Sequence, residues 1–408
     1  MIAIVIIYTY PIYLKVSNYL KELILTIKVL VVFGTRPEAI KMAPICHALQ
    51  ANQDFFKTTI CVTAQHREML DQVLDIFSIT PDIDLNLMKH GQDLTDITSS
   101  ILVGMRNIFI NDRPDLVLIH GDTTTTLATA IAAYYAKVPV GHIEAGLRTN
   151  QIYAPFPEEF NRQVASKITR WHFAPTELSR INLVNEGYEK KSIMVTGNTV
   201  IDSLFWVIEK LDKDIARKDK IISLLSKRLT FDWQNEKYIL ITGHRRENFG
   251  VGFIEICEAI AELAIKYPSV HFIYPVHLNP NVQDPVNSLL SKAKNIHLIS
   301  PLDYEPFVYL MKHSFIVLTD SGGIQEEAPS LGKPVLVMRD VTERPEAIEA
   351  GTVKLVGANK KIIIYEVSNL IDNPSNYSKM SMSHNPYGDG QASNRILEVI
   401  KEEFNEKI

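Results

Sequence analysis

Short runs of β-branched and other apolar residues alternate with helix-like segments from Lys28 almost to the end of this chain of 408 residues. Six runs come first, at residues 29–33, 59–63, 116–120, 138–143, 172–174 and 193–196, and six follow, at residues 238–242, 270–275, 296–299, 315–319, 334–338 and 352–355. Such alternation is typical of parallel sheets covered by helices on both faces. The sequence therefore predicts an α/β fold with two Rossmann-like, doubly wound domains facing a cleft, with ligands at the carboxyl ends of the strands.

Two segments lie outside this strand pattern. Residues 201–234 are rich in charge, and we expect a solvated helical region there, near the domain junction. Residues 1–27 precede the first strand, and their apolar part contains Pro11 and is shorter than the ~20 residues of a membrane-spanning helix. We therefore expect residues 1–27 to be a poorly ordered extension and not a membrane anchor.

The composition excludes several classes of protein. A formal net charge of -5 does not favour a nucleic-acid binder, which would need a basic face. Cys46, Cys61 and Cys257 are far apart, which excludes a disulfide framework and a CxxC metal site and makes a reducing cytoplasm the default location. The chain has no GxGxxG after a strand, no GxxxxGKS or GxxxxGKT and no HExxH. We therefore expect no cofactor and no metal.

The second half of the chain contains a candidate phosphate site. The apolar run at residues 315–319 is followed by Asp320-Ser321-Gly322-Gly323 and then by a helix-like segment. A helix that begins after Ser-Gly-Gly directs backbone N–H groups and the positive end of its dipole at a ligand. Taken alone, the stretch suits an ordinary βα turn. Glu327 is spaced to accept hydrogen bonds from ribose hydroxyls, however, and Arg344 can reach the same space, so the stretch indicates a nucleotide-diphosphate site.

Three acids occupy the polar segments that follow strands of the first half. Asp122 comes directly after one strand, where it could instead be the N-cap of a helix over residues 127–135. Glu144 ends the next strand, and Glu158 and Arg162 are four residues apart on one helix face. Capping alone does not explain three acids at successive loops, so they are candidates for acid–base chemistry.

Cations and a histidine follow strands as well. Arg36 lies in a glycine turn after the first strand and Lys41 follows it, where both could grip a phosphate or a sugar. Surface cations on a first helix are an equally good interpretation. His244 follows the first strand of the second half and could be a phosphate ligand, a general acid or a structural histidine.

The ordered set of these motifs resembles the non-hydrolysing UDP-N-acetylglucosamine 2-epimerases of bacteria, from Lys28 to the C-terminal helix. The matching motifs are Phe33-Gly34-Thr35-Arg36-Pro37-Glu38, Thr63-Ala64-Gln65-His66-Arg67, His120-Gly121-Asp122-Thr123, His142-Ile143-Glu144-Ala145-Gly146-Leu147-Arg148, Pro157-Glu158-Glu159, Thr196-Gly197-Asn198-Thr199, Thr242-Gly243-His244-Arg245-Arg246-Glu247-Asn248 and Thr319-Asp320-Ser321-Gly322-Gly323.

The resemblance implies a glycosyltransferase-B-like fold and a cytoplasmic homodimer without a membrane or nucleic-acid partner. The expected domains are residues 28–200 and 201–391, with a helix over residues 392–408 that packs back on the first domain. The implied activity is the reversible conversion of UDP-GlcNAc to UDP-ManNAc for bacterial surface polysaccharides. A second UDP-GlcNAc molecule is implied as an activator, at Gln65, His66 and Arg67.

The resemblance also assigns roles to single residues. The implied catalytic residues are Asp122, Glu144 and Glu158, supported by Arg162 and His244. The implied contacts to the UDP-sugar, besides Asp122, Glu144 and His244, are Arg36, Lys41, Leu302, Phe307, Ser321, Gly322, Gly323, Glu327 and Arg344. Leu302 is a departure, because some members carry Gln there; nothing is lost if that contact runs through the backbone.

The implied mechanism is elimination of UDP to a bound 2-acetamidoglucal, followed by re-addition. It needs acid and base groups on both faces of the sugar ring, cations on the departing diphosphate and exclusion of water. The sequence does not decide which of the three acids removes the proton and which returns it. Three weaker interpretations are a glycosyltransferase of the same fold, a hydrolysing epimerase that releases free ManNAc and a non-catalytic UDP-sugar sensor.

Overall fold

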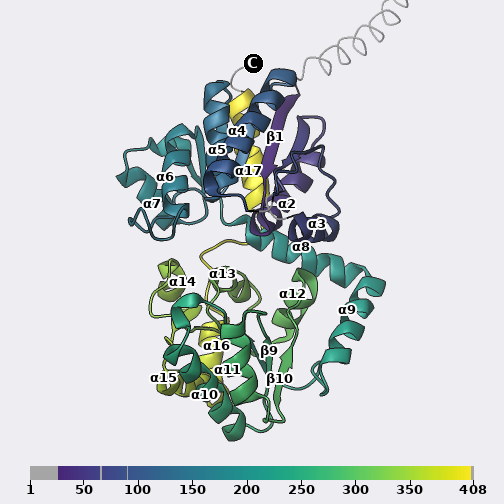
Figure 1. Cartoon of the computed structure of the whole chain (residues 1–408), viewed down its shortest axis with the longest axis vertical. Coiled ribbons are helices and arrows are strands. Elements are labelled where there is room, and N and C mark those ends of the chain that lie inside the picture. Colours follow the sequence, from purple (N-terminus) through teal and green to yellow (C-terminus); the bar gives the residue numbers. More distant parts are fainter. Residues whose placement is uncertain (1–25, 65–66, 90, 406–408) are drawn as a thin grey trace, which may run out of the picture. The chain divides into compact units, whose positions relative to one another are not determined.

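The computed structural model describes residues 26–64, 67–89 and 91–405, which form two compact units (Figure 1). Unit 1 contains the chain up to Ala174, residues Leu183–Met194 and the chain from Ser393 onward; unit 2 contains Pro175–Asn182 and Val195–Ala392. The extension expected over residues 1–27 lies outside the described residues except for Thr26 and Ile27, and Ile27 already belongs to the first strand. None of the described helices is long and apolar enough to cross a membrane.

Unit 1 is organised on a seven-stranded sheet with the order β3-β2-β1-β4-β5-β6-β7. β1 pairs with β2 and β4 in parallel, and β4 pairs with β5 in the same sense. The strands are β1 (Ile27–Phe33), β2 (Phe56–Val62), β3 (Ile83–Asp84), β4 (Leu116–His120), β5 (Val140–Ile143), β6 (Trp171–Ala174) and β7 (Ile193–Val195). The helices of this part of the chain are α2 (Arg36–Gln50), α3 (Arg67–Phe77), α4 (Leu94–Asn111), α5 (Thr124–Tyr135), α6 (Glu158–Ile168), α7 (Glu177–Asn185), η1 (Lys190–Ser192) and α17 (Ala392–Asn405).

Unit 2 is organised on a six-stranded sheet with the order β10-β9-β8-β11-β12-β13, and its strand pairs are parallel. The strands are β8 (Tyr238–Thr242), β9 (His271–Pro275), β10 (Ile296–Ile299), β11 (Ile316–Thr319), β12 (Val335–Val337) and β13 (Val353–Leu355). The helices are α8 (Thr199–Lys213), α9 (Ile215–Arg228), η2 (Arg246–Asn248), α10 (Val251–Lys266), α11 (Pro280–Leu290), α12 (Tyr304–His313), α13 (Gly322–Ser330), α14 (Pro345–Glu349), α15 (Lys360–Asp372) and α16 (Pro374–Ser381).

Both sheets reverse their strand order beside the first strand of the unit. In unit 1 the reversal lies between β1 and β4, and in unit 2 it lies between β8 and β11. At such a point the loops at the carboxyl ends of the two strands leave toward opposite faces, and ligands of doubly wound sheets bind there. Each unit therefore has its own place for a site.

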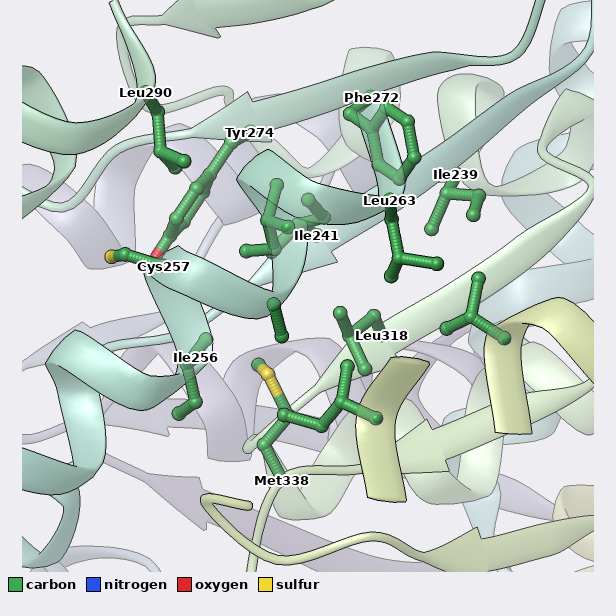
Figure 2. Packing of buried hydrophobic residues seen from close by; sticks show 14 of the residues in the cluster. Ile239, Ile241, Ile256, Cys257, Leu263, Phe272, Tyr274, Leu290, Leu318 and Met338 are labelled. Atoms are coloured by element: carbon green, nitrogen blue, oxygen red, sulfur yellow. The ribbon is translucent and has the colours of Figure 1, made fainter. Parts of the chain in front are cut away.

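The core of unit 2 supports the loop after β8. Tyr274 packs among Ile241, Cys257 and Leu290 in a cluster of buried apolar residues (Figure 2). Its ring is fully buried, and its hydroxyl donates a hydrogen bond of 2.7 Å to the carbonyl oxygen of Gly243. The core thereby fixes the backbone next to the loop that carries the predicted site histidine.

The predicted α/β class, with two doubly wound parallel sheets, is confirmed, and the twelve predicted strands form. One strand was missed, and one predicted helical region differs in detail. β3 was missed because a strand of two residues leaves no apolar run. The helical region predicted over residues 201–234 breaks at Asp214, whose side chain caps α9 by accepting from the N–H of Arg217, and α9 ends at Arg228.

Candidate active site

The sheet register brings two acidic loops of unit 1 together. In the pairing of β4 with β5, His120 lies opposite Ile143, and the N–H of Gly121 donates to the carbonyl oxygen of Ile143 at 2.9 Å. Asp122 stands two residues beyond β4, and Glu144 stands one residue beyond β5. Both carboxylates therefore lie at the carboxyl edge of the sheet, on neighbouring loops.

Each of these two acids has a basic partner that was itself a predicted site residue. Arg162 Nη2 lies 2.5 Å from Asp122 Oδ2, and Lys41 forms an ion pair with Glu144. His120 Nε2 lies 3.8 Å from the same Glu144 oxygen. Burial lowers the pKa of His120 to about 4, so this imidazole is neutral near pH 7. The structure thus gathers four predicted site residues into one cluster.

Asp122 is in an environment suited to holding a proton. Burial raises the pKa of its carboxyl group, and repulsion from Glu144 and Glu158 adds to this effect. The Arg162 and Lys41 charges act in the opposite direction, and the net pKa is raised. An acid whose pKa lies nearer to neutrality is a better proton donor and acceptor at physiological pH.

The third predicted acid, Glu158, is the first residue of α6. Its Oε2 atom is buried and has no hydrogen-bond partner among the described residues. Glu158 and Arg162 share a helix face by sequence spacing, but the Arg162 guanidinium contacts Asp122 and, at 3.5 Å, Glu159. A buried carboxylate oxygen without a protein partner is a natural contact for a ligand.

A buried glutamate that was not predicted as a site residue joins two of these loops. Glu38 accepts hydrogen bonds from the N–H groups of Gly34 (3.0 Å) and Thr35 (2.8 Å) and from the hydroxyl of Thr123 (2.6 Å). Thr123, not Asp122, is the N-cap of α5. The capping interpretation of Asp122 is therefore wrong, and its carboxylate is available for the pair with Arg162.

Two further side chains hold the backbone around Asp122. The ring of His142 contacts the carbonyl oxygen of Gly121 through Nε2 at 2.7 Å, and Asn161 donates to the carbonyl oxygen of Asp122 at 2.8 Å. Burial lowers the pKa of His142 to about 3, so the neutral ring donates this hydrogen bond. Sequence reasoning missed both residues, although His142 stands two positions before Glu144 on a buried strand.

The stretch predicted to bind a diphosphate lies at the start of α13 in unit 2. Ser321 is the N-cap of α13, and its side chain makes no capping hydrogen bond within the described part of the chain. The helix begins at Gly322, so the N–H groups of its first turn lie at the carboxyl end of β11. These groups and the helix dipole form an anion-binding position.

Arg344 reaches this helix start, as the sequence predicted. A Cβ atom on Gly322 would lie 2.8 Å from Arg344 Nη1, so the guanidinium covers the space that glycine leaves open. Glu326 fixes the arginine through a 2.6 Å contact with Nε, and Asn198 donates to the other Glu326 oxygen at 3.1 Å. This site thus combines a helix N-terminus with the Arg344 guanidinium, which Glu326 holds in place.

The remaining predicted contacts of unit 2 lie on neighbouring elements. Glu327 is buried and accepts a hydrogen bond of 2.7 Å from the hydroxyl of Tyr304, at the start of α12. Phe307 is half-buried on the same helix, and Leu302 is half-buried in the loop before it. The assignment of Glu327 to a ribose stays a prediction, since the structure shows a tyrosine as its partner.

His244 stands two residues beyond β8, and its side chain is 45% exposed. The N–H groups of His244 and Arg245 both donate to Asp320 Oδ2 at 2.8 Å. Asp320 is fully buried and was not predicted as a site residue. Its position between a buried strand and the glycine turn is the signal that would have identified it.

Four predicted site residues lie at helix starts or outside the described residues. Arg36 is half-buried and begins α2. Gln65 and His66 lie outside the described residues, and Arg67 begins α3, although its side chain is not described. Across residues 26–64, 67–89 and 91–405, no group of three or more His, Cys, Asp or Glu side chains could hold a metal ion.

The fold and the two clusters define the class of protein. The chain has two parallel doubly wound sheets. One carries paired carboxylates and cations, and the other carries an anion-binding helix N-terminus. This combination is typical of enzymes that act on nucleotide-linked substrates. The UDP-N-acetylglucosamine 2-epimerase family model matches residues 47–401. The chain therefore belongs to the UDP-N-acetylglucosamine 2-epimerase family, and the predicted family is confirmed.

Individual proteins show the same similarity. The UDP-N-acetylglucosamine 2-epimerase of Escherichia coli K12 is 58% identical over 374 residues, which cover 92% of this chain and 98% of the relative. The crystal structure of the Neisseria meningitidis UDP-GlcNAc 2-epimerase bound to UDP-GlcNAc is 54% identical, has a TM-score of 0.84 and covers 92% of this chain and 100% of its own. The Methanocaldococcus jannaschii enzyme in complex with UDP-GlcNAc and UDP is 32% identical, with a TM-score of 0.75 and the same coverage.

Proposed function

We propose that this chain interconverts UDP-GlcNAc and UDP-ManNAc by inverting the second carbon of the sugar. The observation that carries the proposal is the cluster in unit 1, where Asp122 pairs with Arg162 and Glu144 pairs with Lys41 on adjacent loops. A relative of 54% identity is bound to UDP-GlcNAc, which supports the same substrate for this chain. The supply of UDP-ManNAc to bacterial surface polysaccharides in the cytoplasm is part of the proposal.

The reaction that fits these groups is an elimination followed by an addition. The bond between the first sugar carbon and the UDP oxygen breaks, and its electron pair leaves with UDP. A base removes the proton from the second carbon, and a carbon–carbon double bond forms, giving 2-acetamidoglucal. An acid then returns a proton to the opposite face of the second carbon, and the UDP oxygen attacks the first carbon again. No oxidant or reductant is needed.

Two proton transfers on opposite faces require at least two groups in different surroundings. Asp122 has a raised pKa and a guanidinium partner, whereas Glu144 lies between an ammonium group and a neutral imidazole. Glu158 adds a third carboxylate, with one buried oxygen that has no partner among the described residues. These differences support separate roles for the three acids. They do not assign the removal or the return of the proton to one of them.

The departing UDP needs stabilisation of its developing negative charge. In the proposal, the first N–H groups of α13 and the Arg344 guanidinium bind the diphosphate, and Glu327 binds the ribose. In the proposal, His244 contacts the substrate through Nε2 of its imidazole.

The Asp122→Asn substitution tests the acid–base role. It keeps the shape of the side chain and removes its ability to exchange a proton at neutral pH. We expect turnover of UDP-GlcNAc to fall by about 10²- to 10⁴-fold, as for the loss of a general acid–base group. The affinity for UDP, measured by titration calorimetry, should stay nearly unchanged, because the diphosphate is held by other groups.

Asp54→Asn is a control, since Asp54 is exposed and lies between α2 and β2, at the amino end of β2. Its turnover should equal that of the wild type. Equal losses of turnover and of UDP affinity in Asp122→Asn would contradict the proposed role, because the residue would then serve binding alone.

We also propose that a second copy of the chain covers the apolar face formed by α4 and α5 of unit 1. A groove of about 560 Å³ lies between these helices. The side chains of Val103, Ile110 and Tyr135 along it are 48%, 73% and 76% exposed. An apolar face of this kind is typical of a contact between protein chains. It supports the homodimer that the family resemblance implies.

The substitution Ile110→Asp tests this face by placing a charge in it. We expect the mass measured by light scattering to change from that of a dimer in the wild type to that of a monomer. Ile265→Asp is the matched control, because Ile265 is 81% exposed on α10 of unit 2. A monomeric wild type, or a dimer that Ile110→Asp leaves intact, would contradict the proposed contact.

A second UDP-GlcNAc molecule as activator is the last part of the proposal, with Gln65, His66 and Arg67 as its contacts. It is supported by the resemblance of the motif that contains them. We expect the initial rate to depend sigmoidally on the UDP-GlcNAc concentration, and His66→Ala to make the dependence hyperbolic. A hyperbolic dependence in the wild type would contradict activation by the substrate.

A further inference from the structure

One oxygen of the Asp320 carboxylate accepts hydrogen bonds from the loop that carries His244. Oδ2 accepts the backbone N–H groups of His244 and of Arg245, each at 2.8 Å. The residue is fully buried, directly after β11. This oxygen therefore fixes the backbone of the histidine loop.

The second oxygen of Asp320 faces the histidine side chain. Oδ1 is buried and has no hydrogen-bond partner among the described residues, and it lies 3.9 Å from His244 Nδ1. A buried carboxylate oxygen that lacks a partner is unfavourable in the charged state. The imidazole, by contrast, is 45% exposed and stacks on His277, with ring centroids 5.1 Å apart and planes 11° apart. A hydrogen bond between Nδ1 and Oδ1 would require the partly exposed ring to move closer to the carboxylate.

The carboxylate itself is held rigidly. The N–H of Asp320 donates to the carbonyl oxygen of Thr242 at 3.1 Å, and the hydroxyl groups of Thr242 and Thr319 are 2.6 Å apart. Tyr274 binds the carbonyl oxygen of Gly243 from the core. Because the acid is fixed on both sides and the ring is not, a small movement of the ring alone completes the contact.

We propose that Asp320 is the positioning residue of His244: its Oδ1 accepts the Nδ1–H of the imidazole, so that the ring presents Nε2 to the bound ligand. Fixing one tautomer through the nitrogen that does not react is a general way to prepare a histidine. The identity of that ligand as a UDP-sugar rests on the proposed function. The tautomer and orientation of the ring do not.

The charges around His244 have opposing effects on its protonation. Burial is the largest and lowers its pKa, and the neighbouring His277 and Arg245 lower it as well. The Asp320 carboxylate raises it, and the net pKa is below the usual value for histidine. The ring is consequently neutral near pH 7, where the choice between its two tautomers decides whether Nε2 accepts or donates a proton.

The Asp320→Asn substitution separates the two tasks of the acid. The amide oxygen can still accept hydrogen bonds from both backbone N–H groups, so the loop keeps its conformation. The amide nitrogen then faces Nδ1 as a donor, which requires Nδ1 to accept and moves the ring proton to Nε2. The same substitution in a Ser-His-Asp triad leaves the geometry intact and gives the wrong tautomer.

Nitrogen NMR of the full-length protein with labelled histidine measures this directly, with the His244 signals assigned by their loss in His244→Gln. In the wild type we expect a protonated Nδ1 and an unprotonated Nε2. In Asp320→Asn we expect an unprotonated Nδ1 and a protonated Nε2. We also expect the titration midpoint of His244 to move to lower pH, since the carboxylate that stabilised the imidazolium is gone. Turnover should fall at least about 10-fold, as for other residues that orient a functional histidine.

Asp202→Asn is the matched control, because Asp202 is a buried acid of the same unit that accepts the N–H of Ala392. It should leave the His244 spectrum unchanged. An Nε2–H tautomer in the wild type would overturn the proposal without any variant, as would an Asp320→Asn protein with the tautomer and titration of the wild type. Because the spectra need no substrate, the absence of epimerisation by the wild type would contradict the proposed function and leave this result standing.

Discussion

The parallel register of β4 against β5 is the constraint on which the acidic cluster depends. Pairing of His120 with Ile143 sets Asp122 and Glu144 side by side at one edge of the sheet. A slip of one residue would turn each side chain to the opposite face, and Glu144 would lose Lys41. Gly121 and Glu144 both have a positive φ, at 65° and 62°. This conformation is unfavourable for glutamate by roughly 1–2 kcal/mol.

The same arrangement recurs in unit 2 with different chemistry. Thr319 lies opposite Thr242 in the pairing of β11 with β8, and Asp320 directly follows β11. In unit 1 the loops that follow paired strands bring acids and cations together. In unit 2 they place a buried acid where it accepts two backbone N–H groups, next to the start of a helix. One topological rule thus produces a cluster suited to proton transfer and a cradle suited to an anion.

The sequence predicted the positions of these residues better than their partners. Apolar runs locate parallel strands, because both faces of such strands are buried, and the polar residues after them lie at the ligand-binding edge. The partner of a side chain depends instead on register and loop conformation, which spacing does not reveal. Arg162 was expected on a face with Glu158 but contacts Asp122, and Thr123 took the capping role considered for Asp122. Glu38 and Asp320 were missed, and both accept hydrogen bonds from backbone N–H groups.

Nuclear magnetic resonance of the protein with UDP-GlcNAc in deuterium oxide would follow the proposed epimerisation at the second sugar carbon. We expect that UDP-ManNAc appears and that its second sugar carbon carries deuterium, because the proton removed there exchanges with solvent before one is returned. Unchanged, unlabelled UDP-GlcNAc after prolonged incubation would contradict the proposed epimerisation. Free ManNAc with UDP would contradict the return of UDP to the sugar and indicate hydrolysis.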